Sequence, residues 1–185
     1  IFEALCSNTN ITSFNFEGNQ HIPGGLQSLG NLTYLNISKV KNQHGLLALF
    51  EGLKNNETLL SLDCRHNTIH DVNILNAFHD MIRVNRTLTS LDIRYQDVDI
   101  LLHIIPLAKA LKSNNTLKKL CMGDVPTSSN KIRLNDDLIN YMKNSTALNY
   151  VHIDALYMTE KSLTDLSQVL QNRNLTTLII DYCRQ

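Results

Sequence analysis

The chain has 185 residues, of which 43% are hydrophobic, enough for a substantial core. Lysine plus arginine equals aspartate plus glutamate at 17 each, so the formal net charge is zero. We therefore expect no attraction of the chain as a whole to DNA, RNA or an anionic membrane. No apolar run in the sequence approaches the roughly 18 to 20 residues of a membrane-spanning helix.

A short pattern recurs along the whole chain: an aliphatic residue, two variable residues, an aliphatic residue, one variable residue and an apolar residue. Successive copies start 21, 27, 29, 29, 31 and 27 residues apart, by subtraction of their first residue numbers. Such a period predicts a stacked array in which each unit buries its apolar residues against its neighbours. The copies are Ile11-Phe14-Phe16, Leu32-Leu35-Ile37, Leu59-Leu62-Cys64, Leu88-Leu91-Ile93, Leu117-Leu120-Met122, Leu148-Val151-Ile153 and Leu175-Leu178-Ile180.

The repeats predict a single domain over 1–185, because no linker rich in glycine, serine or proline interrupts them. Residues 1–8 align with 107–114, which is the end of a predicted helix in a later unit. We therefore expect the chain to be a fragment of a longer array or of a larger protein.

Each unit is expected to contain one strand and one helix. The last four positions of each copy have the alternation of a short strand, and strands joined by helical crossovers must lie parallel. The first crossover, 22–29, is short and predicts only a turn or a 3₁₀ segment. Later crossovers have apolar residues at the spacing of amphipathic helices: Leu46, Leu49, Phe50 and Leu53; Leu75, Phe78, Met81 and Ile82; Ile104, Leu107 and Leu111; Leu138, Tyr141 and Met142; and Leu163, Leu166, Val169 and Leu170.

Three further features predict where the helices begin and end. Asn135 and Thr159 are typical helix N-caps. Pro106 favours a helix that begins at this residue, with 97–105 irregular. Asparagine-rich turns at 55–59 and 85–88, and again at 114–117, predict a left-handed asparagine that stops each helix.

These units resemble leucine-rich repeat proteins, and the spacing of 27 to 31 residues with full helices resembles the ribonuclease-inhibitor-like subclass. The resemblance implies an α/β solenoid of about seven repeats, with a curved parallel sheet on the concave side and helices on the convex side. It also implies a buried asparagine three residues after the last apolar strand residue, and we expect this hydrogen-bond ladder to be broken. Asn19 and Asn67 match that position, Cys183 is a permitted replacement, and Val40, Gln96, Val125 and Leu156 do not match.

Side chains between the buried strand positions should form rows on the concave face, since neighbouring strands lie about 4.8 Å apart. One row is Asn15, Asn36, Asp63, Asp92, Cys121, His152 and Ile179. The next row is Glu17, Ser38, Arg65, Arg94, Gly123, Asp154 and Asp181.

Repeats three to five thereby gather charged residues, for which two interpretations stay open. The first interpretation is a self-neutralising ladder of ion pairs across the strands. Alternatively the charges bind a partner, with Arg65 and Arg94 as bidentate donors to carboxylates or phosphates. The gathered residues are Asp63, Arg65, Asp92, Arg94, Lys118 and Lys119.

A second cluster is expected at the far end of the array, where Tyr150, His152, Asp154, Ile179 and Asp181 project beside one another. Tyrosine is a typical interface anchor, and Tyr34 offers another near the opposite end. The loop 125–133 in the longest repeat is either a binding excursion or a neutral insertion. The predicted partner-binding residues are therefore Asp63, Arg65, Asp92, Arg94, Lys118, Lys119, Tyr150, His152 and Asp154.

No catalytic or cofactor-binding motif is recognisable, so we expect neither an enzyme nor a cofactor. Cys64, His66 and His70 complete no tetrahedral ligand set, and no metal site is predicted. Cys121 is expected to face outward on the concave side. A reactive thiol stays open there, but no histidine partner is assigned that would give it a catalytic role. Cysteines scattered over four repeats, without a paired framework, favour a reducing compartment such as the cytoplasm.

The array favours a protein–protein interaction module that binds a protein partner through its concave face. Irregular repeats and abundant asparagine are compatible with a bacterial effector acting on host proteins in the host cytoplasm. Two alternatives remain: a GTPase-activating protein of the Ran-activator type, and the substrate-recognition arm of a larger enzyme. Neither a nucleic-acid partner nor a membrane span is expected.

Overall fold

The computed structural model describes residues 7–22, 30–40, 44–67, 69, 71–96, 100–123, 134–154 and 159–181. Seven strands form one parallel sheet in chain order, as the repeats predicted. The strands are β1 (Ser13–Asn15), β2 (Tyr34–Asn36), β3 (Ser61–Asp63), β4 (Ser90–Arg94), β5 (Lys119–Gly123), β6 (Tyr150–Asp154) and β7 (Thr177–Asp181).

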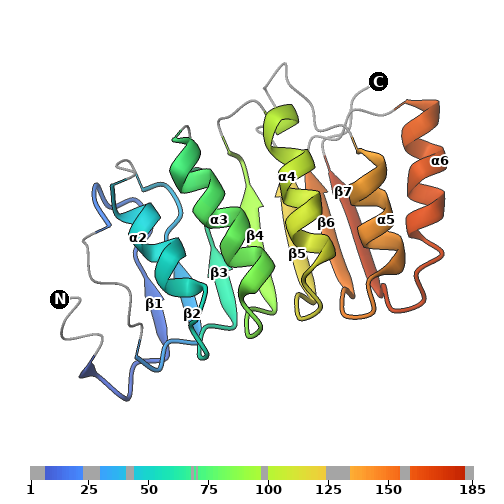
Figure 1. The fold of residues 1–185 in the computed structure, drawn as a ribbon. Coiled ribbons are helices and arrows are strands. Elements are labelled where there is room, and N and C mark those ends of the chain that lie inside the picture. The colour runs from blue at the N-terminus through green and yellow to red at the C-terminus, as the bar shows by residue number, and fades with distance from the viewer. Residues whose placement is uncertain are drawn as a thin grey trace.

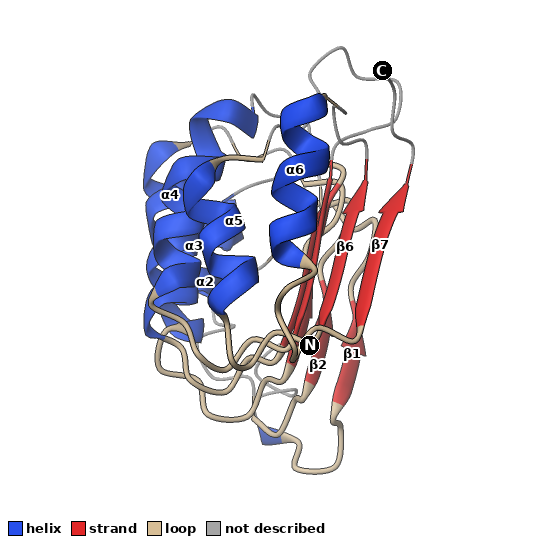
Figure 2. Cartoon of the chain, turned by 90° about the vertical axis from the view of Figure 1, so that its right-hand side faces the viewer, coloured by secondary structure: helices blue, strands red, loops and turns tan. Residues whose placement is uncertain are grey.

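The helices stand side by side along the array (Figure 1) and cover one face of the sheet, while none of those described covers the opposite face (Figure 2). This is the expected α/β architecture of a leucine-rich-repeat-like solenoid. None of the described helices is both long and hydrophobic enough to traverse a lipid bilayer. The helices are α2 (His44–Leu53), α3 (Val72–Val84), α4 (Ile100–Lys112), α5 (Asp136–Asn144) and α6 (Glu160–Val169).

Equivalent aliphatic residues of consecutive strands share one core. Leu35, Leu62, Leu91, Leu120 and Val151 pair in register and are each at most 1% exposed. This confirms the predicted common spine of the array. Helix residues that pack into the same cluster include Leu46, Leu49, Phe50, Leu53, Phe78, Met81, Ile82, Leu107, Leu111, Leu138, Tyr141, Met142, Leu166 and Val169.

Two helix predictions were wrong. Leu163 and Leu170 are 59% and 67% exposed, because the buried face of α6 is formed instead by residues that include Asp165 and Leu166. Pro106 lies inside α4 rather than at its start. The proline is exposed, so water can hydrate the carbonyl that loses its helical hydrogen bond, and the buried stripe of the helix continues past it. The two predicted N-caps, Asn135 and Thr159, are confirmed.

The asparagines that follow the helices act through their side chains. Asn85 has φ −61° and ψ 139°, which is extended backbone, so the predicted left-handed conformation was wrong. Its Nδ2 donates to the carbonyls of Leu53 and Asn56 in the preceding unit, at 2.8 and 3.0 Å. Its Oδ1 accepts from the backbone N–H groups of Thr87 and Leu88 at 2.9 and 2.7 Å. One buried amide therefore satisfies four backbone groups of two units.

The same arrangement recurs along this edge of the array. Asn114 donates to the carbonyls of Ile82 and Asn85, and Asn172 bridges its own unit to the preceding one. The turns thus contain a ladder of buried amides that fixes how consecutive units stack.

The second ladder, which the family resemblance implied, is only partly broken. Asn67 is 1% exposed, donates to the carbonyls of Ile37 and Cys64, and accepts from the N–H of Val40. Gln96 keeps one such bond, from Nε2 to the carbonyl of Cys64 at 2.8 Å, but its buried Oε1 has no partner among the described residues. The longer glutamine therefore preserves the donor half of the link.

The remaining positions of that second ladder contribute less. Asn19 is exposed and, among the described residues, donates only to carbonyls of its own turn, those of Phe16 and Glu17. Val125, Leu156 and Cys183 lie outside the described residues.

The asparagine turns give a paired stability test. Asn114→Ala should lower the free energy of unfolding by about 1–3 kcal/mol, because it strands two buried carbonyls and the N–H groups of Thr116 and Leu117. Asn115→Ala is the control, since this neighbouring asparagine is exposed, and it should change stability by less than about 0.5 kcal/mol. Urea denaturation measures both, and equal losses would contradict the bridging role of Asn114.

Candidate functional site

One face of the sheet is turned away from the described helices (Figure 2). The strand register places the predicted rows of side chains on this face. One row runs in register through Asn36, Asp63, Asp92, Cys121, His152 and Ile179. Beside it, the backbone pairs Arg94, Gly123, Asp154 and Asp181 in register across β4 to β7.

Arg65 is paired within its own repeat. Its Nε and Nη2 bind the carboxylate of Asp63 at 3.0 and 2.7 Å, and its Nε lies 3.7 Å from Asp92 on the next strand. The hydrogen bond with Asp63 raises the pKa of Arg65 above its usual value. The closest ion pair therefore runs along the strand, and only the weaker contact crosses to β4. Arg65 keeps 32% of its side chain exposed.

Arg94 connects three charged or polar partners. It binds the carboxylate of Asp92 with Nε and Nη2 at 3.0 and 2.7 Å. Its Nη1 donates to Oδ2 of Asp154 at 3.3 Å and lies 3.2 Å from Nδ1 of His152. The hydrogen bond with Asp92 is the main reason that the pKa of Arg94 is raised. A side chain from β4 thus reaches over β5 to bind two residues of β6.

Gly123 allows this long reach. It lies between Arg94 and Asp154 in the register, and a Cβ atom at Gly123 would come within 2.4 Å of the Cβ of Asp154. With no side chain at this position, the carboxylate of Asp154 settles over β5 and is only 1% exposed although it lies on the open face. The glycine therefore creates the buried part of the site.

Cys121 lies in the outer row, as predicted, but it is covered by its neighbours and is not accessible as a reactive thiol would be. It lies in register between Asp92 and His152 and is 1% exposed. Burial, and next the charge of Asp92, raise the pKa of the thiol to about 11. Arg94 and His152 contact each other across this strand, which explains why so small a side chain is shielded.

His152 joins the far edge of the sheet to this network. Its Nε2 lies 3.1 Å from Oδ2 of Asp181 on β7 and 3.1 Å from Oδ1 of Asp154. Asp181 is half exposed, with 51% of its side chain accessible. We call Asp92, Arg94, His152, Asp154 and Asp181 the charged cluster. The sequence predicted that His152, Asp154 and Asp181 lie together, but their connection to Arg94 was missed. The small residues Cys121 and Gly123 on the intervening strand were the sequence feature that could have indicated it.

The remaining predicted residues lie at the surface beside this cluster. Nζ of Lys119 stands 4.6 Å from the ring centroid of Tyr150, a cation–π contact between β5 and β6. Lys118 immediately precedes β5 and is exposed. Tyr34 lies half-buried on β2, and burial is the main reason that its pKa is raised. Three residues of the predicted set, Lys118, Lys119 and Tyr150, thus form one accessible group.

Other predicted features lie elsewhere or outside the description. Cys64 is 1% exposed in the core, and the ring of His66 stacks on Tyr95 with centroids 4.7 Å apart. His70 and the loop 125–133 lie outside the described residues.

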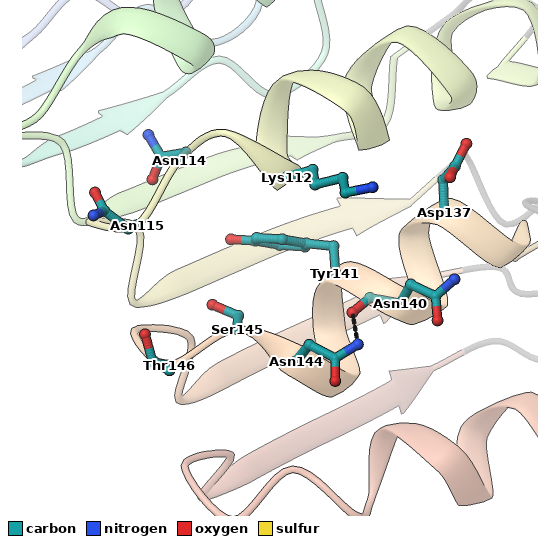
Figure 3. A pocket seen from close by; sticks show the side chains of 9 residues that line it. All are labelled: Lys112, Asn114, Asn115, Asp137, Asn140, Tyr141, Asn144, Ser145 and Thr146. Carbon is teal, nitrogen blue, oxygen red and sulfur yellow. Dashed lines mark hydrogen bonds between the residues drawn. The ribbon is translucent and has the colours of Figure 1, made fainter.

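A hollow of about 400 Å³ lies between α4 and α5, away from the charged cluster. Figure 3 shows the ring of Tyr141 extending from α5 between Asn114 and Ser145. Burial raises the pKa of the Tyr141 hydroxyl to about 12, a shift that nearby Ser145 partly offsets, although no aligned hydrogen bond reaches this hydroxyl from the described residues. The lining residues are Lys112, Asn114, Asn115, Asp137, Asn140, Tyr141, Asn144, Ser145 and Thr146.

No protein-family model and no curated protein matches this chain. Among solved structures, it is similar to one described as leiomodin-1 actin-binding site 2, with a TM-score of 0.56 and 17% identity over 92% of this chain and 86% of that chain. It is also similar to the tropomodulin C-terminal domain of Caenorhabditis elegans, with a TM-score of 0.61 and 12% identity over 94% of this chain and 92% of that chain. At such low identities these likenesses show the fold alone, which is leucine-rich-repeat-like.

The two arginines of the open face should differ in their effect on stability. Arg94→Met should lower the free energy of unfolding by at least about 2 kcal/mol, because it leaves the buried carboxylate of Asp154 without its cation. Arg65→Met should cost less than Arg94→Met, because the side chain of Arg65 is 32% exposed against 16% for Arg94, and Asp63 keeps 9% exposure against 1% for Asp154. Urea denaturation compares them, and a smaller loss for Arg94→Met than for Arg65→Met would refute the assigned network.

Cys121 should resist thiol reagents in the folded protein. A thiol with a pKa of about 11 is ionised on the order of a hundredfold less at pH 8 than one with an ordinary pKa, and burial also blocks access. In a Cys6→Ser, Cys183→Ser background, Ellman's reagent should label neither remaining cysteine at pH 8 until guanidinium unfolds the chain. Labelling should rise only as the pH approaches 11, and rapid labelling of folded protein at pH 8 would show that Cys121 is accessible.

Proposed function

We propose that this chain is a non-enzymatic protein-binding module and that a protein partner binds the open face of its sheet. The observation that carries this proposal is the row of charged and aromatic side chains on a face that no described helix covers. One structural neighbour is described as an actin-binding site, which supports a protein partner and makes actin the first candidate to test.

The predicted interface residues divide into two groups by their contacts. The first group, whose main contribution is to hold a rigid, preorganised surface, comprises Asp63, Asp92, Arg94, His152 and Asp154. The last four already contact one another, and Asp63 is buried and held by Arg65. Residues with accessible side chains make the direct contacts: Arg65, Lys118, Lys119 and Tyr150.

Tyr150 and Lys119 form the centre of the proposed contact surface. The tyrosine offers a large apolar ring with a polar hydroxyl, and the ammonium of Lys119 is already positioned over that ring. With Lys118 next to Lys119 in the chain, this surface is suited to acidic groups of a partner. Binding to a preformed sheet requires little backbone rearrangement.

The narrower predictions from the sequence extend this proposal. The repeat spacing supports the ribonuclease-inhibitor-like subclass, and an effector acting on host proteins would use the open face in the same way. A GTPase activator of the Ran-activator type would supply polar residues from loops and edges, whereas a substrate-recognition arm would leave catalysis to another domain. The buried thiols of Cys64 and Cys121 support a reducing compartment such as the cytoplasm.

The interface can be tested with a matched pair of multiple variants. Lys118→Ala, Lys119→Ala and Tyr150→Ala combined should weaken partner binding at least tenfold, because the change removes an aromatic anchor and two charges. Lys109→Ala with Lys112→Ala removes two exposed charges from α4 on the opposite side and should leave affinity unchanged. Co-sedimentation with filamentous actin is the first measurement.

If actin does not bind, immobilised protein and both variants are used to capture and identify partners from cells, followed by a titration with the purified partner. Equal affinity of the wild type and the open-face variant would show that this face is not the interface. Stimulated GTP hydrolysis by a small GTPase would support the alternative activity instead. Circular dichroism of both variants confirms that the fold is retained.

A further inference from the structure

We propose that His152, Asp154 and Asp181 form a binding site for one divalent transition-metal ion, of the class that includes Zn²⁺. His152 and Asp154 lie on β6, and Asp181 is the register partner of Asp154 on β7. Each residue presents one ligand atom, and these atoms lie within 4.8 Å of one another. No protein partner is needed to complete this site.

Two of the three distances between the ligand atoms suit a small cation. Nε2 of His152 is 3.1 Å from an oxygen of Asp154 and 3.1 Å from an oxygen of Asp181. Bonds of about 2.05 Å to one ion, at angles between octahedral and tetrahedral values, place neighbouring ligands roughly 2.9–3.4 Å apart. The half-exposed Asp181 side chain can adjust, whereas Asp154 is held in place.

An unsatisfied buried oxygen is the second, independent observation. Asp154 is 1% exposed, and its Oδ1 accepts no hydrogen bond from the described residues. Although Nε2 of His152 lies 3.1 Å from this oxygen, the direction is wrong for a hydrogen bond. An unpaired buried carboxylate oxygen is unfavourable, and a cation between Oδ1 and Nε2 would satisfy it.

The other oxygen of Asp154 is held as in many metal sites. Arg94 donates from Nη1 to Oδ2, which orients the carboxylate and leaves Oδ1 directed toward His152. Metal-binding carboxylates are typically hydrogen-bonded through such outer partners. The guanidinium of Arg94 does not compete for Oδ1, and most of its charge is balanced by its bidentate contact with Asp92.

The local charge also favours a divalent cation. The charged cluster and the adjacent pair on β3 contain four carboxylates, Asp63, Asp92, Asp154 and Asp181, and two guanidiniums, Arg65 and Arg94. With His152 neutral, four negative and two positive charges leave an excess of two negative charges, which one divalent ion balances. One imidazole with two carboxylates suits Zn²⁺ or Mn²⁺ better than Ca²⁺, which prefers oxygen ligands alone.

The contact with Arg94 determines the proton position on His152 before a metal binds. Arginine has no acceptor, so Nδ1 of His152, 3.2 Å from Nη1, must carry the lone pair and Nε2 must carry the proton. A metal at Nε2 displaces this proton, which moves to Nδ1. Nη1 of Arg94 then loses its contact with the ring but keeps its bond to Oδ2 of Asp154, and Nε and Nη2 keep their bonds to Asp92. Metal binding therefore switches the tautomer of one identified histidine.

Zinc binding to the full chain can be measured by isothermal titration calorimetry in a buffer with a non-chelating reductant. We expect one equivalent of zinc per chain, with affinity reduced at least about tenfold by His152→Gln and by Asp181→Asn. Asp181→Asn changes a half-exposed residue, so it should fold normally. His66→Gln is the matched control, an exposed histidine in the turn after β3, and should leave the affinity unchanged.

Nitrogen-15 NMR of the histidine rings gives a second measurement, which reports the ring nitrogen that carries the proton. Weak binding of zinc elsewhere on the surface would not change the tautomer of His152. The proton of His152 should lie on Nε2 without zinc and on Nδ1 with one equivalent of zinc. The proposal is overturned if no zinc binds, if zinc binds both site variants with wild-type affinity, or if the tautomer of His152 stays the same at saturation.

Discussion

The structure depends on one constraint, which is that parallel strands of successive repeats pair without any shift in register. Leu62, Leu91 and Leu120 occupy the same level of neighbouring strands, so their side chains fill one core. Because side chains alternate along a strand, the residue after each of these leucines points to the opposite face. The pairing that buries the leucines therefore also aligns Asp63, Asp92 and the rest of the outer row.

This constraint explains how much of the fold could be predicted from the sequence. The positions and order of the strands could be predicted because the pattern of Leu88, Leu91 and Ile93 recurs in every unit. A recurring pattern implies that each unit places its strand at the same point of the array. The start of α4 and the role of Asn85 could not be predicted in the same way. At Pro106, packing of the buried helix face outweighed the preference of proline for the first turn of a helix. At Asn85, a side-chain hydrogen bond to the preceding unit ends the helix, and the left-handed backbone conformation is not needed.

The candidate site could be predicted only as a set of rows. Register places Arg94, Gly123 and Asp154 on one level, but it does not say how far a side chain reaches across that level. The guanidinium spans a strand only because the residues beneath it are a cysteine and a glycine. As a consequence, Asp154 lies on the open face with only 1% of its side chain exposed. From the strand pattern alone, such burial would be expected only for residues on the core side of the sheet.

The two proposals meet on this face through electrostatics. Without a metal, the cluster on β4 to β7 carries an excess of negative charge beside the positive surface of Lys118 and Lys119. A divalent ion at His152 would remove that excess, so an acidic partner approaching the lysines would meet less repulsion from Asp154 and Asp181. Each exposed charge pair contributes at most about 1 kcal/mol, and the cluster is held by bonds to Arg94. A metal would therefore tune the affinity of a preformed surface rather than create that surface.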